Sequence, residues 1–199
     1  MNDFILFFKL GLKHVLDFQA YDHILFLLVL AIPYTSKQWK NLLWLITMFT
    51  IGHTLTLTLA AYDILTVDAG LIEFLIPFTI FCTALYNIFS AGKGQNGSKI
   101  TLIFTFCFGW IHGLGFSYYL QMLLNDAESK LLPLLEFSLG IEGAQVIITI
   151  FVLILFTILN LLFKVAKRDW ILVISAIVVG IVLPMMNERF GVFIKSLLN

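Results

Sequence analysis

Long apolar runs, rather than any single motif, most constrain what this chain can fold into. A helix that crosses the hydrocarbon core of a bilayer needs about 20 mostly apolar residues, and the chain offers six runs of that kind. Hydrophobic residues make up 60% of the chain and charged residues only 12%, about half the charged share of a typical soluble domain. The candidate spans are residues 15–34, 41–62, 72–91, 100–122, 134–163 and 170–186.

These runs predict an all-α fold, a polytopic membrane helical bundle of about six transmembrane helices in one integral membrane domain over residues 1–199. The segment FILFFKLGL precedes the first run. It is too short to span, so we expect it to lie flat as an interfacial helix. Membrane lipids are the expected surroundings. A formal net charge of zero provides no basic face for nucleic acid.

The short loops between the runs alternate in charge. The first, third and fifth loops carry seven Lys and Arg residues, whereas the second and fourth carry one. The seven are Lys37, Lys40, Lys93, Lys99, Lys164, Lys167 and Arg168. Because cations in short loops stay cytoplasmic, these three loops are expected in the cytoplasm and both termini outside. We expect an integral protein of a bacterial inner membrane.

Four ionisable residues fall at one depth in four different runs. At 1.5 Å per helical residue they lie roughly 12–15 Å below the outer surface; they are His23, His53, His112 and Glu142. Ionisable groups are costly at such depth and usually face one another inside a bundle. Three histidines with a carboxylate are ligands for Zn²⁺, Ni²⁺ or Co²⁺. The pattern predicts a divalent metal site facing the outer, periplasmic side, with a purely structural polar network as the alternative.

His14 and Asp22 complete the set of candidate metal-site residues. On a continuous helix His14 and His23 point about half a turn apart, so they cannot face one site. Either the helix breaks near DFQAY, or His14 is an entry residue that supports the ligands from outside. The second interpretation is favoured here. Asp22 is a natural acceptor that would orient an imidazole.

Four segments together resemble the HupE/UreJ family of membrane proteins: GLKHVLDFQAYDHILFLLVLAI, IGHTLTLTLA, FGWIHGLGF and LGIEGAQ. The resemblance runs from about residue 11 to residue 145. It implies an accessory protein of hydrogenase or urease maturation that acts as a nickel or cobalt permease, with metalloenzyme maturation proteins as possible partners. The metal residues it implies are His14, Asp22, His23, His53, His112 and Glu142.

Two functions fit one such site. The first is a Ni/Co-type divalent metal transporter, although few polar groups besides Asn87 occupy the inner half of the runs. The second is a membrane-embedded zinc-dependent hydrolase or transferase, in which the three histidines hold the metal and Glu142 or Asp22 takes the proton. A structural metal in a scaffold protein is a third possibility.

Overall fold

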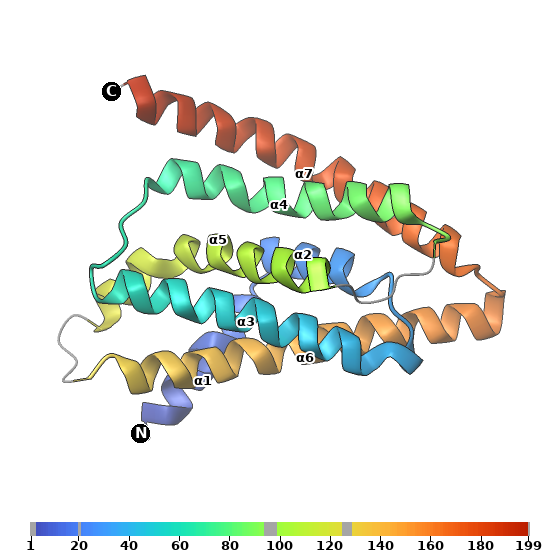
Figure 1. Cartoon of the computed structure of the whole chain (residues 1–199), viewed down its shortest axis with the longest axis horizontal. Helices are drawn as coiled ribbons and strands as arrows, with labels where there is room; N and C mark the ends of the chain where they lie inside the picture. The colour runs from blue at the N-terminus through green and yellow to red at the C-terminus, as the bar shows by residue number, and fades with distance from the viewer. Residues whose placement is uncertain (1–2, 20, 94–98, 125–128, 199) are drawn as a thin grey trace.

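The structure, a computed structural model, describes residues 3–19, 21–93, 99–124 and 129–198. This part of the chain is helical and contains no strand, which confirms the all-α prediction (Figure 1). The helices are α1 Asp3–Val15, α2 Asp22–Ala31, the short 3₁₀ helix η1 Ser36–Gln38, α3 Trp39–Ala61, α4 Ala69–Ser90, α5 Lys99–Leu124, α6 Leu131–Phe163 and α7 Lys167–Leu198.

Four helical segments among the described residues are long and apolar enough to cross a membrane, so the predicted count of six spans is not confirmed. They are Ser36–Ala61, Ala69–Ser90, Leu131–Phe163 and Lys167–Lys195. The first predicted span contains the break between α1 and α2, and α2 has only 10 residues, about 15 Å of helix. α5 matches the predicted run 100–122, but its second half mixes glycine, serine, tyrosine and glutamine with the apolar residues.

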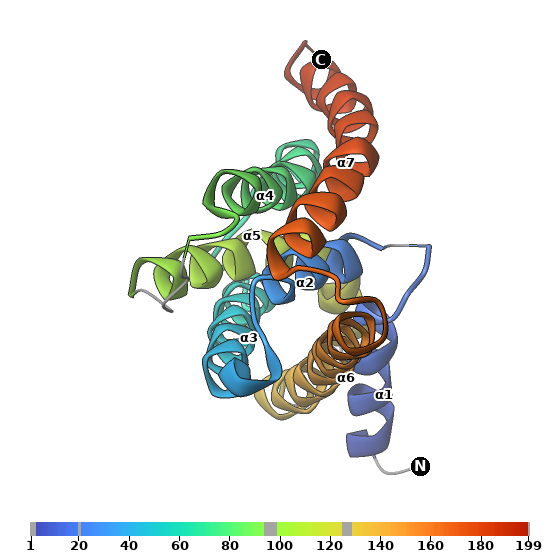
Figure 2. The ribbon, with the colours of Figure 1, turned by 90° about the vertical axis from the view of Figure 1, so that its right-hand side faces the viewer.

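The helices form layers, and α2 and α5 make up the middle layer. Figures 1 and 2 show α2 and α5 between a pair formed by α4 and α7 and a pair formed by α3 and α6. α1 lies outside that second pair and packs on α6. A helix is thus present where an interfacial one was predicted, and its depth relative to a bilayer stays a prediction.

Glycines set the closest helix contacts. A Cβ atom on Gly52 or Gly109 would overlap a backbone carbonyl oxygen of the facing helix, so α3 and α5 meet backbone to backbone. A Cβ atom on Gly11 or Gly140 would likewise overlap a backbone carbonyl oxygen at the contact between α1 and α6. Small residues allow such approaches between membrane helices. Because α1 is held this tightly, its last turn brings His14 into the bundle.

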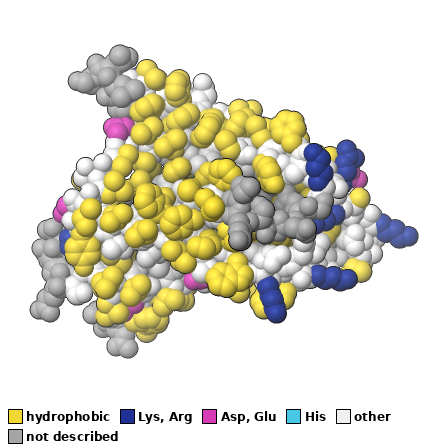
Figure 3. Space-filling model, in the orientation of Figure 1, with side chains coloured by type: hydrophobic (Ala, Val, Ile, Leu, Met, Phe, Trp, Pro, Cys, Tyr) yellow, Lys and Arg dark blue, Asp and Glu magenta, His cyan; other side chains and the backbone are white. Residues whose placement is uncertain are grey.

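Lysine and arginine gather at one end of the molecule, where α6 turns into α7 (Figure 3). The α4–α5 and α6–α7 connections meet there, since a Cβ atom on Gly92 would lie 3.4 Å from the Arg168 side chain. We call this end the cationic end; its loops carry Lys37, Lys40, Lys93, Lys164, Lys167 and Arg168. The three cation-rich loops share it, and the side of the membrane that it faces stays a prediction.

Candidate metal centre

The chain between α1 and α2 breaks the helix and thereby turns two histidines toward each other. The backbone N–H of Gln19 donates to Oδ1 of Asp17 at 2.9 Å, a local bond that competes with helix formation. The His14 and His23 ring centroids are 4.6 Å apart. Of the two sequence interpretations, the structure therefore has the broken helix. The favoured interpretation set His14 at the entry, whereas the structure places it beside His23 and His53 in the group that could hold a metal ion; its role as a ligand stays a prediction.

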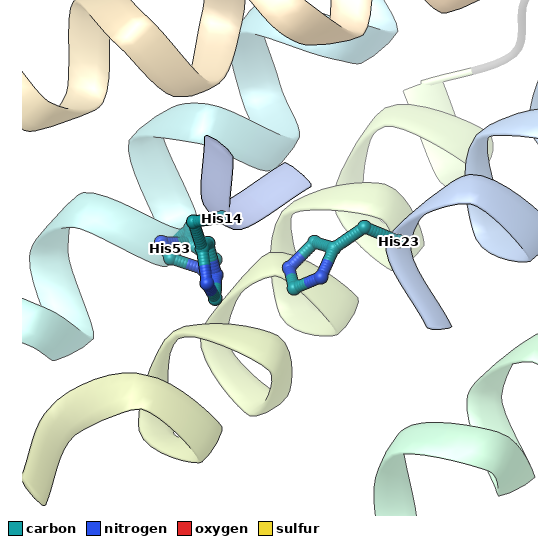
Figure 4. A group of neighbouring side chains, drawn as sticks. All are labelled: His14, His23 and His53. Atoms are coloured by element: carbon teal, nitrogen blue, oxygen red, sulfur yellow. The ribbon is translucent and has the colours of Figure 1, made fainter. Parts of the chain in front are cut away.

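Three histidines from three helices converge on one point. His14, His23 and His53 each offer a ring nitrogen, and these nitrogens all lie within 4.8 Å of one another (Figure 4). Two nitrogens bound to one tetrahedral zinc ion are about 3.4 Å apart. Small side-chain rotations would therefore bring the group to ligand spacing. It is a group of side chains that could hold a metal ion.

Four ring nitrogens of this group are buried without a protein partner. His14 Nε2, His23 Nε2 and both ring nitrogens of His53 are buried without a hydrogen bond, and His53 is 0% exposed. A buried polar atom left unpaired costs about 1–3 kcal/mol, so an unpaired cluster calls for a partner, either ordered water or an ion. A divalent transition metal that prefers imidazole would bind one nitrogen of each of the three rings, and the second nitrogen of His53 would still need a partner. The residues present thus fit such an ion.

His112 stands next to the group with one nitrogen already engaged. Its Nε2 lies 3.1 Å from the Thr79 hydroxyl, and its ring centroid lies 5.3 Å from that of His23. Nδ1 of His112 is buried and unpartnered. The structure therefore brings all four histidines of the chain together, with His112 at the margin. Nothing in the sequence pattern distinguished Thr79 from other membrane threonines.

Glu142 lies elsewhere. It accepts a hydrogen bond from the Thr47 hydroxyl at 2.6 Å, and in the next turn of α6 Gln145 accepts one from Thr50 at 2.9 Å. Thr47 precedes His53 by six residues, about 9 Å along α3. The structure thus assigns Glu142 to the α3–α6 contact and does not bring it into the histidine group.

Asp22 faces the last helix instead of a ring nitrogen. Its Oδ2 pairs with an Arg189 guanidinium nitrogen at 3.0 Å, while Oδ1 is buried and unpartnered. Arg189 also donates to the Glu73 carbonyl at 3.2 Å. The sequence reasoning missed Arg189, because it follows the last predicted span and no spacing links it to Asp22.

Replacing Arg189 with glutamine is expected to tighten metal binding several-fold. The guanidinium neutralises the carboxylate next to His23, and its removal eliminates a positive charge near the cation, an effect on the order of 1 kcal/mol. Equilibrium dialysis with Ni²⁺ measures the change, and Arg168→Gln at the cationic end is the matched control. Weaker binding in Arg189→Gln would instead mean that the ion pair holds α2 in place.

A cavity of about 330 Å³ adjoins the histidines and reaches the protein surface at Lys13, which is exposed. Residues of α1, α2, α4 and α5, and of the break, line it: Leu10, Lys13, His14, Asp17, Asp22, His23, Ile76, His112, Gly115, Phe116 and Tyr119. Its polar lining residues extend from the surface to the histidine rings.

Comparison with known families identifies the chain. A family model described as HupE / UreJ protein matches residues 1–187, nearly the whole chain. Neither the comparison with curated proteins nor that with solved structures finds a match. The match includes every histidine of the cluster and stops just before Arg189. The chain belongs to the HupE/UreJ family.

Proposed function

We propose that the protein is a membrane transporter for a divalent transition-metal ion of the nickel or cobalt kind. The observation that carries this proposal is the group of His14, His23 and His53, with buried unpaired nitrogens, beside a cavity that reaches the surface. Membership of the HupE/UreJ family, which is associated with nickel and cobalt transport and with metalloenzyme accessory roles, supports the same cargo. Maturation proteins of such enzymes are the proposed recipients.

In this proposal the cation enters from the side opposite the cationic end. Positively charged loops stay in the cytoplasm, so the cavity opens to the periplasmic face of a bacterial inner membrane. Asp17 lines the cavity and attracts the ion, whereas the Asp22 carboxylate is paired with Arg189. The three histidines replace part of the water shell of the ion. Imidazole nitrogens bind nickel, cobalt and zinc, whereas Mg²⁺ and Ca²⁺ prefer oxygen ligands.

One observation favours a second function, a zinc-dependent hydrolase or transferase at the same site. Oδ1 of Asp22 is buried and unpaired next to His23. A carboxylate near a three-histidine zinc site can accept the proton of a metal-bound water. In that case the metal would stay bound, and the 330 Å³ cavity would admit an organic substrate.

Uptake of radioactive nickel into proteoliposomes tests the transport proposal. We expect the wild-type protein to move Ni²⁺ into the vesicles, and His23→Ala to reduce uptake by more than about 100-fold, because loss of even a residue that supports a metal ligand costs 10–100-fold. Glu142→Gln is the matched control, since that side chain lies at the same predicted depth but outside the group.

The outcomes separate the two functions. Flux in the wild-type protein and in Glu142→Gln, without flux in His23→Ala, supports transport. Zinc that stays bound at one ion per chain through purification, with no flux of any divalent metal, contradicts transport and favours the enzyme. Elemental analysis of the same preparation provides the metal content.

A further inference from the structure

A second cavity opens sideways from the bundle between α4 and α5. It has a volume of about 440 Å³, and residues of α2, α4 and α5 line it. At its rim Tyr86 is 57% exposed and Phe104 is 58% exposed, whereas Phe26 and Leu30 of α2 are buried at its floor. The other lining residues are Cys82, Thr83, Thr101, Thr105 and Phe108. The cavity is thus a groove that leads inward from the surface of α4 and α5 to α2.

The polar side chains near this groove are already engaged elsewhere. The hydroxyls of Thr83 and Thr105 each donate, at 2.8 Å, to the carbonyl four residues earlier in their own helix. Such back-bonding satisfies a threonine without any outside partner. Asn87 does not line the groove and donates to the Val29 carbonyl at 2.6 Å. The lining therefore suits a hydrocarbon chain rather than an ion or a polar molecule.

The groove opens onto a surface that a bilayer would cover. α4 is long and apolar enough to cross a membrane, and the large apolar side chains of Phe89 and Ile103 are exposed on α4 and α5. Along α5 the groove uses residues 101–108, about 10 Å of helix. An acyl chain of one leaflet, which occupies half of a hydrocarbon core about 30 Å thick, is long enough to fill it.

Positive charge lies about one helical turn beyond the rim of the groove. Tyr86 precedes the last residue of α4, Ser90, by four residues, and the Ser90 carbonyl accepts a hydrogen bond from the Lys93 backbone at 2.9 Å. The Arg168 side chain adjoins the same turn. Lys93 and Arg168 are exposed, with Asp169 as the acidic neighbour. A tyrosine at headgroup level is typical of a membrane interface, so these cations face the level of lipid phosphates.

We infer that the groove between α4 and α5 binds an acyl chain of an anionic phospholipid from the leaflet at the cationic end, and that Lys93 and Arg168 bind the headgroup of this lipid. Basic pockets between membrane helices bind anionic headgroups. Because all lipid tails are equally apolar, the preference comes from headgroup charge, and the groove fixes where the tail lies. The tail ends at Phe26, whose ring centroid lies 5.1 Å from that of His112, so the lipid packs behind the metal centre. The inference goes beyond the proposed function and requires no metal flux.

A photoreactive lipid tests the groove. The protein is reconstituted into phosphatidylcholine vesicles that contain a small share of phosphatidylglycerol with a diazirine on one acyl chain, and peptide mass spectrometry locates the adducts. We expect adducts to concentrate on residues 82–86 and 101–108. Unlabelled phosphatidylglycerol should remove them, and unlabelled phosphatidylcholine should not. Adducts spread evenly over the exposed faces of α6 and α7, or equal competition by both lipids, would overturn the inference.

A double variant, Lys93→Gln with Arg168→Gln, tests the headgroup contact. Each basic residue near the surface contributes about a factor of five to the attraction of an anionic membrane lipid, so we expect the yield of groove adducts to fall at least about fivefold. Lys37→Gln with Lys40→Gln is the matched control, because it removes the same charge from another loop of the cationic end. Equal losses in both double variants would mean that diffuse charge attracts the lipid, and would overturn the headgroup site.

Filling the groove provides an independent test. Cys82 lines the groove and is half-buried, so Cys82→Trp should lose the groove adducts. Ile103→Trp, at an exposed position outside the lining, should keep them. If Cys82→Trp does not fold, the charge variants still decide the result.

A second copy of the chain is the alternative occupant of the groove. Cys107→Ser leaves Cys82 as the only thiol of the chain. Efficient cross-linking of Cys82 between two chains by a membrane-soluble bifunctional thiol reagent would assign the groove to a second copy and overturn the lipid site, whereas we expect the protein to stay a monomer in this test.

Discussion

His53→Ala is expected to abolish stoichiometric metal binding. His53 is fully buried, neither of its ring nitrogens has a protein partner, and it lies in the long helix α3. Loss of a partner outside the ligand shell already costs 10–100-fold in metal affinity, so we expect loss of a direct ligand to cost more than about 100-fold. Elemental analysis of purified protein and Ni²⁺ titration by calorimetry measure the effect, and His14→Ala should match it.

Two control variants make this prediction specific. Glu142→Gln should bind metal as the wild type does, because the Glu142 carboxylate accepts from Thr47 and lies outside the histidine group. His112→Ala should fall between the two, since one of its nitrogens is engaged by Thr79. Metal loss in Glu142→Gln equal to that in His53→Ala would contradict the placement of Glu142.

Depth could be predicted from sequence, because the rise along a helix is fixed. Counting residues from the run ends placed His23, His53 and His112 at one level, and the structure brings their rings together. The same count placed Glu142 at that level. In the structure Glu142 pairs with Thr47, about 9 Å along α3 from His53, so the count from the end of the run misplaced Glu142 along the helix axis. No residue count reveals the pairing of Glu142 with Thr47.

The break between α1 and α2 shows a second limit of sequence reasoning. Hydropathy treats residues 15–34 as one run, whereas the structure interrupts it with a turn in which the Asp17 side chain bonds to the Gln19 backbone, after a helix α1 that packs tightly on α6. The sequence left open whether His14 is an entry residue or the helix is broken, because the direction in which a side chain points can be counted along a helix only if the helix is continuous. The role of Arg189 could not be predicted from the sequence, because its ion pair with Asp22 joins residues from opposite ends of the chain.

Metal is expected to stabilise the folded protein strongly and selectively. A ligand at 100 times its Kd contributes about 2.7 kcal/mol, and 1 kcal/mol raises Tm by about 2–4 °C in a protein of this size. Saturation with Ni²⁺ or Zn²⁺ should therefore raise Tm by about 5–10 °C, and a chelator should reverse the increase. Thermal unfolding in detergent, followed by intrinsic fluorescence, measures the shift.

The difference in Tm shift between metals tests whether the ligands are imidazole nitrogens. Mg²⁺ takes oxygen ligands, and the group of His14, His23 and His53 offers it none, so Mg²⁺ should leave Tm unchanged. His53→Ala should show no shift with Ni²⁺, because the remaining imidazoles hold the ion too weakly to stabilise the fold. An equal shift with Mg²⁺, or in His53→Ala, would place the bound metal on carboxylates such as Asp17. The unpaired nitrogens would then need another explanation. The proposed transport path, which begins at these three rings, would lose its support.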